Sequence, residues 1–177
     1  MNDERLIVYL MRGLPSCGKS TLARDLAGTT GIICETDEFF YTQIGESPDS
    51  YDYSADRLDD ARAWNLERYQ KALGDRVSPI VVDRGNGLNP ETHQYVVLAQ
   101  QQGYEVELRE PDSPWWQELR VLLKYKQYVS SELFDRWAEA LAQKSRQTHR
   151  VPVETIRRWM KAWRAELTVD DILKEAT

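Results

Sequence analysis

Apolar residues fall in short runs that alternate with amphipathic stretches over the first two thirds of the chain. The runs at 5–11, 31–35 and 78–83 are rich in apolar side chains, which predicts strands buried on both faces. The segment 104–109 alternates apolar and polar positions and predicts a fourth strand with one buried face. Each run is bounded by turn-forming residues, so we expect four short strands.

Helical patterns fill the intervals between these strands. We expect helices over 20–27, 54–73 and about 90–102, where apolar residues recur on one face or a glycine follows the last turn. The remaining chain predicts further helices at about 115–124, 130–146, 152–166 and 169–175. Alternation of strand and helix predicts right-handed crossovers, a mainly parallel sheet and a three-layer α/β/α fold with a helical C-terminal lid region.

Length and composition favour one soluble domain. The 177 residues suit a single domain over 1–177, with a core at 1–110 and a helical lid region at 111–177. The apolar runs are too short to span a membrane, and the first residues lack the basic region of a secretory signal. Two cysteines form neither a disulfide framework nor a metal-binding pattern. We expect a cytoplasmic protein with no membrane partner, and no pattern bears on its oligomeric state.

The segment between the first strand and the first helix matches the pattern G-x-x-x-x-G-K-[ST]. It runs from Gly13 to Ser20 and is followed by Thr21. Glycines at both ends allow backbone angles that turn the loop N–H groups inward, where they can bind phosphate oxygens. The predicted site consists of Gly13, Pro15, Ser16, Cys17, Gly18, Lys19, Ser20 and Thr21. This pattern in this context predicts a P-loop NTPase fold that binds ATP with Mg²⁺.

Each polar residue of this loop has an expected role. Lys19 is placed to reach the β- and γ-phosphates of ATP, Ser20 to bind Mg²⁺ through its hydroxyl, and Thr21 to help hold the α-phosphate. Cys17 is expected to be a small residue that fits the loop. The alternative is a thiol whose pKa is lowered by the helix N-terminus, which would make reversible oxidation a gate for ATP binding.

Carboxylates follow the second and third predicted strands. Asp37 is the preferred general base for a hydroxyl acceptor, ahead of Glu35 and Glu38, and the alternative is an acidic loop that caps a helix beginning near Phe39. Asp83 ends an apolar strand, where it is expected to hold Mg²⁺ through water or to anchor Lys19.

Two further polar residues follow Asp83. Arg84 and Asn86 lie in a glycine-rich turn directly after the third strand. We expect both to contact the acceptor, and Asn86 alternatively to contact Mg²⁺-bound water. Together with Asp37 they form the predicted acceptor side of the site.

A basic segment follows in the C-terminal region. Residues 142–164 contain seven Lys or Arg and one Glu, although the whole chain has a net charge of −6. Phosphoryl transfer needs positive charge near the departing phosphate, so Arg146 and Arg150 are the candidate lid residues, and Lys144 is a possible third. The alternative is a solvated helix face. His149 is expected either to contact phosphate or to cap a helix.

These motifs, taken in order, resemble those of the small P-loop kinases related to the kinase domain of polynucleotide kinase. The resemblance is strongest to the AAA_33-type branch, which contains the kinase-like domains of Nedd4-binding proteins. The matching segments are 12–23, 36–40, 61–65, 80–83 with Asn86, 103–106, 110–115 and 148–152. The resemblance implies phosphorylation of a hydroxyl with ATP, often the 5′-hydroxyl of DNA or RNA. It implies that Asp37 is the general base and that Arg146, or the nearby Arg150, is the lid arginine.

Some positions differ from the polynucleotide kinase pattern. Phe40 stands where those kinases carry an arginine that contacts the acceptor's phosphate, and the helical stretch at about 115–141 is extra. The acceptor therefore stays open among a nucleic acid end, a nucleotide or nucleoside, and a modified base in DNA. Two alternatives remain: an ATP-binding module or switch without efficient transfer, and a zeta-toxin-like kinase of sugar nucleotides.

Overall fold

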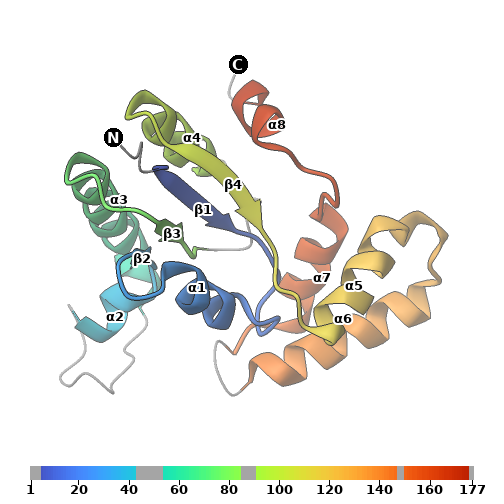
Figure 1. Ribbon diagram of the computed structural model, residues 1–177. Helices are drawn as coiled ribbons and strands as arrows, with labels where there is room; N and C mark the ends of the chain where they lie inside the picture. The colour runs from blue at the N-terminus through green and yellow to red at the C-terminus, as the bar shows by residue number, and fades with distance from the viewer. Residues whose placement is uncertain (1–4, 43–53, 85–90, 147–149, 176–177) are drawn as a thin grey trace.

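A parallel four-stranded sheet forms the centre of the computed structural model, which describes residues 5–42, 54–84, 91–146 and 150–175 (Figure 1). The strands are β1 (Ile7–Met11), β2 (Ile32–Cys34), β3 (Ile80–Val82) and β4 (Glu105–Arg109). Their order in the sheet is β2-β3-β1-β4, and every pairing is parallel. The predicted strands and the parallel sheet are therefore confirmed.

The helices follow the predicted order along the chain. They are α1 (Lys19–Ala27), α2 (Glu38–Thr42), η1 (Ala55–Arg57), α3 (Leu58–Gly74), α4 (Thr92–Gln101), α5 (Pro114–Lys124), η2 (Lys126–Tyr128), α6 (Ser131–Ser145), α7 (Val153–Ala162) and α8 (Val169–Lys174). Within the described ranges, none of them is long and apolar enough to cross a bilayer. Of the helix expected over about 90–102, position 90 lies outside the described residues, and α4 begins at Thr92 with Glu91 as its N-cap.

One predicted helix end is wrong. The helix expected over 152–166 stops at Ala162, because Trp163 has extended backbone angles of φ −58° and ψ 133°. That turn buries the Trp163 ring beneath the guanidinium of Arg12, whose central carbon lies 4.5 Å from the ring centroid. A long-range contact thus ends the helix where the local pattern would have continued it.

Helices cover both faces of the sheet. On one face, Ala23 and Ala27 of α1 pack against Met11 and Val81 of the central strands. On the other face, α3, α4 and α8 pack on a larger core that includes Tyr69, Tyr95 and Ile172, with Val8, Leu10 and Val82 from the strands. Even-numbered β1 residues face this larger core, as the two-residue period of a strand requires. The predicted three-layer α/β/α fold is confirmed.

A second core lies beside the sheet, within the helical unit formed by α5, α6 and α7 (Figure 1). Its members are Leu14, Cys17, Trp116, Leu119, Leu122, Leu123, Phe134, Ala138, Leu141, Ile156, Met160 and Trp163. Leu14 and Cys17 belong to the segment between β1 and α1. That segment therefore lies between the two cores and contacts the helical unit directly. The last helix, α8, returns to pack against α4.

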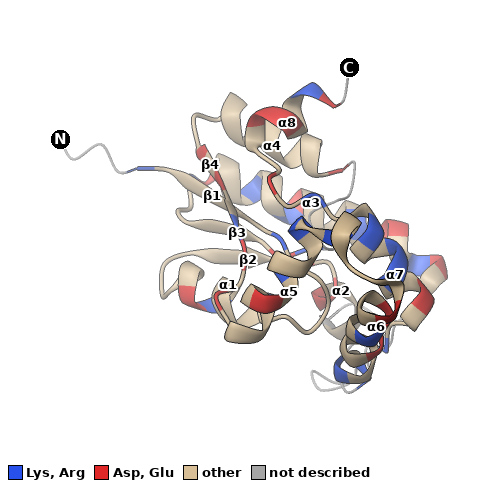
Figure 2. Ribbon diagram, turned by 90° about the vertical axis from the view of Figure 1, so that its right-hand side faces the viewer, with Lys and Arg blue, Asp and Glu red and all other residues tan. Residues whose placement is uncertain are grey.

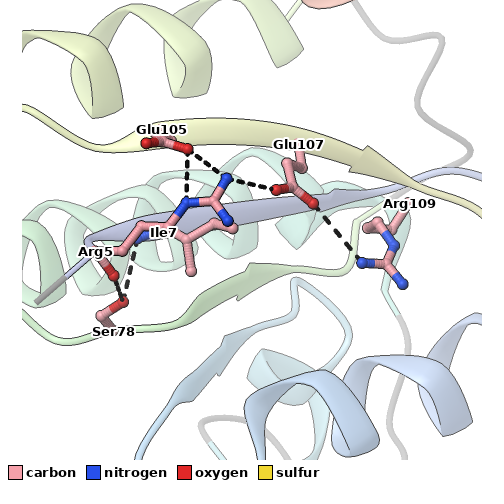
Figure 3. Close-up of polar contacts among 6 residues, drawn as sticks. All are labelled: Arg5, Ile7, Ser78, Glu105, Glu107 and Arg109. Atoms are coloured by element: carbon pink, nitrogen blue, oxygen red, sulfur yellow. Dashed lines mark hydrogen bonds and ion pairs between the residues drawn. The ribbon is translucent and has the colours of Figure 1, made fainter.

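Strand β4 has a polar face, as its alternating sequence predicts. Figure 3 shows Arg5 donating to Glu105 through Nε at 2.7 Å and to Glu107 through Nη2 at 3.1 Å. Arg109 lies 3.7 Å from the other oxygen of Glu107. The alternate residues Val106 and Leu108 pack against the main core. The charged side chains hence form a ladder on the face of β4 that helices do not bury.

Candidate functional site

The segment Gly13–Ser20, here called the phosphate loop, connects β1 to α1 at the carboxyl edge of the sheet. Its turns require glycine, since Gly13 and Gly18 have φ values of +148° and +102°. A Cβ atom on Gly13 would lie 2.5 Å from the Cys17 sulfur, so any side chain there would displace the loop. Ser16 also has positive φ, at +61°. The loop therefore has the positive φ angles that the two glycines of the pattern allow.

The first turn of α1 presents amides and a cation to the loop. Gly18 is the N-cap, and no side chain accepts a hydrogen bond there. Helix N-terminal amides without such a cap favour an anion. The Lys19 ammonium donates to the Gly13 carbonyl at 3.0 Å and reaches that of Leu14 at 3.4 Å. The ammonium thus lies over the loop.

The structure brings the two predicted Mg²⁺ residues together. The Ser20 hydroxyl donates to Oδ2 of Asp83 at 3.1 Å. Ser20 comes from the first turn of α1, and Asp83 follows β3, so 63 residues separate them in sequence. The Asp83 side chain is buried, and its amide donates to the Cys34 carbonyl at 3.1 Å, which extends the pairing of β2 with β3. A hydroxyl and a carboxylate at this spacing are suitable donors for Mg²⁺ or its bound water.

Asp37 lies three residues after the end of the neighbouring strand β2, just before α2 begins at Glu38. Glu38 forms an ion pair with Arg68, whose Nη1 lies 2.5 Å from Oε2. Arg68 itself stacks over the Trp64 ring at 4.5 Å, which holds it in place. Glu38 is therefore engaged in a structural contact with α3. The assignment of Asp37 as the general base stays a prediction.

Glu35, which the sequence analysis placed behind Asp37, is coupled electrostatically to the other carboxylates at this edge of the sheet. Its pKa is raised to about 7, first by burial and then by the negative charges of Asp83, Asp37 and Glu38, in that order. These four carboxylates hence belong to one electrostatic cluster beside Ser20. The signal was present in the sequence, since Glu35 directly follows the buried residue Cys34, but its burial depends on the tertiary fold.

Cys17 does not have the reactive character that its position suggested. The thiol is buried in the core of the helical unit, and burial raises its pKa to about 11. This effect exceeds the lowering by Lys19. The hypothesis of a low-pKa thiol at the helix N-terminus is therefore wrong, and Cys17 serves as a small packing residue.

The segment after β4 supports the phosphate loop from outside, which sequence reasoning did not predict. The Ser113 hydroxyl donates to the Cys17 carbonyl at 3.2 Å and also caps α5 by accepting from the Trp116 amide. Pro111 lies close enough that its Cδ would be 3.3 Å from a Cβ on Gly13. A proline-rich stretch predicted only a loop. Its packing against the phosphate loop is a tertiary contact.

The predicted lid arginines stand at the end of α6. Arg146 is the C-cap of α6, and Arg150 has a φ of +50° with its amide donating to the Ser145 carbonyl at 2.7 Å. Both side chains are exposed, and neither guanidinium has an ion pair among the described residues. Residues between them, including His149, lie outside the described ranges. The core around Leu14 and Leu141 places α6 next to the phosphate loop.

Arg157, one of the three basic residues of α7, is compensated by neighbouring carboxylates. Figure 2 shows acidic and basic residues interspersed over α6 and α7. Arg157 lies 2.8 Å from Asp135, and 3.7 Å from each of Glu139 and Glu154. Arg164 pairs with Glu175. These contacts favour the interpretation of this helix as a solvated face, apart from the exposed Arg146 and Arg150 before it.

The acceptor-side residues are divided between the described and undescribed parts. Asn86 lies outside the described residues. Arg84 is described: its side chain is 9% exposed and pairs with Glu91. It does not extend into solvent as a residue on a surface turn would.

Comparison with known proteins agrees with this geometry. The AAA_33 family model, described as an AAA domain, matches residues 8–167. The chain belongs to this family. The human protein NEDD4-binding protein 2 is similar, with 39% identity over 113 residues, which cover 63% of this chain. The YLP motif-containing protein 1 of human and of rat is 28% identical over 128 residues, or 60% of this chain.

The AAA_33 match spans both cores and the phosphate loop between them. It supports a nucleotide-binding, kinase-like P-loop module. The chain spans only 6% of the length of NEDD4-binding protein 2, and 6% and 9% of the human and rat YLP motif-containing proteins. What those long proteins do as a whole therefore does not transfer to this chain.

Proposed function

We propose that this AAA_33 domain is a kinase that transfers the γ-phosphoryl group of ATP to a hydroxyl group of a nucleotide or of a polynucleotide end. The observation that carries the proposal is the 3.1 Å contact between Ser20 and Asp83 beside the phosphate loop. It joins the end of β3 to the start of α1, where a triphosphate and a divalent cation would meet.

The nucleotide side of the reaction falls to the phosphate loop. Its amides and the Lys19 ammonium would hold the β- and γ-phosphates, and Thr21 would contact the α-phosphate. Ser20 and Asp83 fit Mg²⁺, because a hydroxyl and a carboxylate at 3.1 Å supply hard oxygen donors. When bound, Mg²⁺ would neutralise charge on the phosphate oxygens.

The acceptor side falls to Asp37. Its carboxylate would orient the acceptor hydroxyl and take up its proton while the acceptor oxygen bonds to the γ-phosphorus. The bond from this phosphorus to the bridging oxygen breaks, and ADP leaves. Arg146 or Arg150 would stabilise the charge that develops on the departing phosphate. Their location at the end of α6, whose Leu141 shares a core with Leu14, supports this role.

A transfer screen tests the proposal. The purified chain is incubated with γ-labelled ATP, Mg²⁺ and separate acceptors: 5′-hydroxyl DNA, 5′-hydroxyl RNA, nucleosides, DNA with modified bases, and sugar nucleotides. Label transferred to a nucleic acid or nucleoside hydroxyl, and lost in Lys19→Ala, supports the proposal. Label transferred only to sugar nucleotides supports the alternative acceptor. ATP binding without transfer to any acceptor would make the chain a nucleotide-dependent binding module.

A further inference from the structure

Arg84 is a buried arginine that joins the end of β3 to the start of α4. Its side chain is 9% exposed, and Nη2 forms an ion pair with the carboxylate of Glu91. The guanidinium also lies over the Tyr95 ring of α4, with its central carbon 5.5 Å from the ring centroid. Both contacts of this side chain are therefore made with α4 or with its N-cap residue.

The carboxylate of Glu91 is itself held in place. It lies at the N-terminus of α4, where the partial positive charge of the helix favours an anion. One oxygen faces Arg84, and the other lies 3.5 Å from Nε of Arg62 on α3. Arg62 is in turn paired with Asp59, one turn earlier in the same helix, at 3.1 Å. The ion pair of Arg84 is therefore tied to α3 as well as to α4.

The Tyr95 ring is fixed by hydrogen bonds inside the main core. Its hydroxyl accepts from Nδ2 of Asn65, a fully buried residue of α3, at 3.2 Å. The Tyr69 hydroxyl donates to the Tyr95 carbonyl at 2.9 Å, and the two rings lie 4.7 Å apart. Moving the ring would leave buried polar groups unpaired, which is costly. The surface on which Arg84 lies is therefore rigid.

Asp83 lies between this anchor and the sheet. It follows Val82, the last residue of β3, and its amide donates to the Cys34 carbonyl at 3.1 Å. Because the peptide unit that joins Asp83 to Arg84 is planar, the position of Arg84 restricts the backbone angles of Asp83. Those angles set the direction of the carboxylate that accepts from Ser20 at 3.1 Å.

We propose that Arg84 is a positioning residue for Asp83. Its contacts with Glu91 and Tyr95 hold the Asp83 carboxylate beside Ser20, in the arrangement that suits Mg²⁺. The role of Asp83 in this inference rests on the proposed function. Arg84 itself contacts no substrate, because its Nε and Nη1 atoms are buried. Arginine suits the position, since its planar group pairs with a carboxylate and stacks on a ring at the same time, which an ammonium group does not.

Amide hydrogen exchange in the nucleotide-free chain tests the positioning without any ligand. Arg84→Lys retains the charge and loses the planar group, so the variant should fold. We expect the Asp83 amide to exchange about tenfold faster relative to the Leu10 amide of the central strand β1, as for the loss of one charge-assisted hydrogen bond. The matched control is Tyr69→Phe, which removes a buried hydrogen bond from the same core without contacting Arg84. In this control the two amides should change together.

The affinity for a divalent cation is the second measurement, and it needs no phosphoryl transfer. Mn²⁺, a paramagnetic substitute for Mg²⁺, is titrated into the chain with ADP, and free Mn²⁺ is measured by electron paramagnetic resonance. Arg84→Lys should weaken Mn²⁺ binding about tenfold, whereas Tyr69→Phe should leave it unchanged. Ser20→Ala gives the loss expected when a proposed ligand is removed. Urea denaturation of each variant establishes that it is folded under the conditions of the assay.

Each result decides the inference. Faster exchange at Asp83 together with weaker Mn²⁺ binding supports the positioning role. Arg84→Lys would overturn it by leaving either readout unchanged, and so would equal effects in Tyr69→Phe. If Arg84→Lys does not fold, Arg84→Met combined with Glu91→Gln takes its place, since removing both charges leaves no buried ion unpaired.

The outcome for the proposed function is separate. If both readouts change as expected and no acceptor is phosphorylated, the kinase function is rejected and the positioning role stands. A wild-type chain that binds no Mn²⁺ in the presence of ADP would reject the cation site, and the positioning role with it.

Discussion

Arg12, the residue that precedes the phosphate loop, is joined to Glu110 at the end of β4 by an ion pair of 3.2 Å between Nη1 and Oε1. The Arg12 side chain is 3% exposed, and burial lowers its pKa despite the nearby carboxylate. Its Nη2 donates to the Arg164 carbonyl at 2.6 Å, and the second oxygen of Glu110 accepts from the Trp116 indole at 3.2 Å. This ion pair therefore links the phosphate loop to both ends of the helical unit.

Removing the carboxylate should destabilise the fold strongly. Glu110→Gln leaves Arg12 as a buried charge without its counterion, and we expect a loss of about 3–5 kcal/mol in the free energy of unfolding. Urea denaturation monitored by tryptophan fluorescence measures it. The control is Glu105→Gln, which breaks the exposed pair with Arg5 in Figure 3 and should destabilise the fold far less, because solvent screens that pair. Equal losses of unfolding free energy in the two variants would show that the buried ion pair stabilises the fold no more than the exposed one.

Lys19→Ala should abolish tight ATP binding while the chain stays folded. The ammonium contacts only loop carbonyls in the described structure, so its removal exposes no buried charge. Calorimetric titration with ATP and Mg²⁺ measures affinity, and circular dichroism confirms folding. Lys71→Ala, which removes an exposed lysine at the end of α3, is the control. Wild-type affinity in Lys19→Ala would reject the assignment of the phosphate loop.

Asp37→Asn should retain ATP affinity and slow transfer by about two to four orders of magnitude, as expected for a general base. Single-turnover transfer with the acceptor found in the screen measures the rate. Glu38→Gln is the matched control, because Glu38 is paired with Arg68 and is expected to affect the rate far less. A larger loss in Glu38→Gln than in Asp37→Asn would reassign the base.

The two lid candidates can be separated by mutation. Arg146→Ala should slow transfer without changing ATP affinity, since the Arg146 side chain is exposed and lies at the end of α6. Arg150→Ala is compared in the same assay, and Arg158→Ala on α7 serves as the control. Full activity in Arg146→Ala combined with a loss in Arg150→Ala would transfer the lid role to Arg150.

Glu35 predicts a specific dependence of stability on pH. Its folded-state pKa of about 7 lies above the ordinary value of 4.5. Between these values the folded state binds a proton that the unfolded state has released, so stability falls as pH rises through this range. Glu35→Gln should remove that loss. Its free energy of unfolding should exceed that of wild type by about 1–3 kcal/mol at pH 8, whereas at pH 4.5 the two free energies should be equal.

Denaturation at a series of pH values, with EDTA present to exclude divalent cations, measures this difference. The control is Glu67→Gln on the exposed side of α3. For this variant, the curve of unfolding free energy against pH should stay parallel to that of wild type. If the Glu35→Gln curve also stays parallel to that of wild type from pH 4.5 to 8, the raised pKa is wrong.

The sequence alone determined the strands, the phosphate loop and the residues that surround it. These features depend on local patterns: the apolar run of β1, the glycines at 13 and 18, and a carboxylate directly after β3. Parallel pairing then brings the carboxyl ends of the strands to one edge of the sheet. It could therefore be predicted that Ser20 and Asp83 lie near each other, although not at what distance. The family resemblance rested on the same segments and was confirmed.

Tertiary structure alone decided the features that depend on burial and on distant partners. The pKa values of the Cys17 thiol and the Glu35 carboxyl are raised by what packs around them, which no spacing in the chain encodes. The early end of α7 and the link from Arg12 to Glu110 join residues separated by about a hundred positions or more. The sequence pattern predicted that Arg84 lies in a turn, whereas in the fold its side chain is buried beside Tyr95. Such contacts form between side chains that only the complete fold brings together, and local propensity carries no information about them.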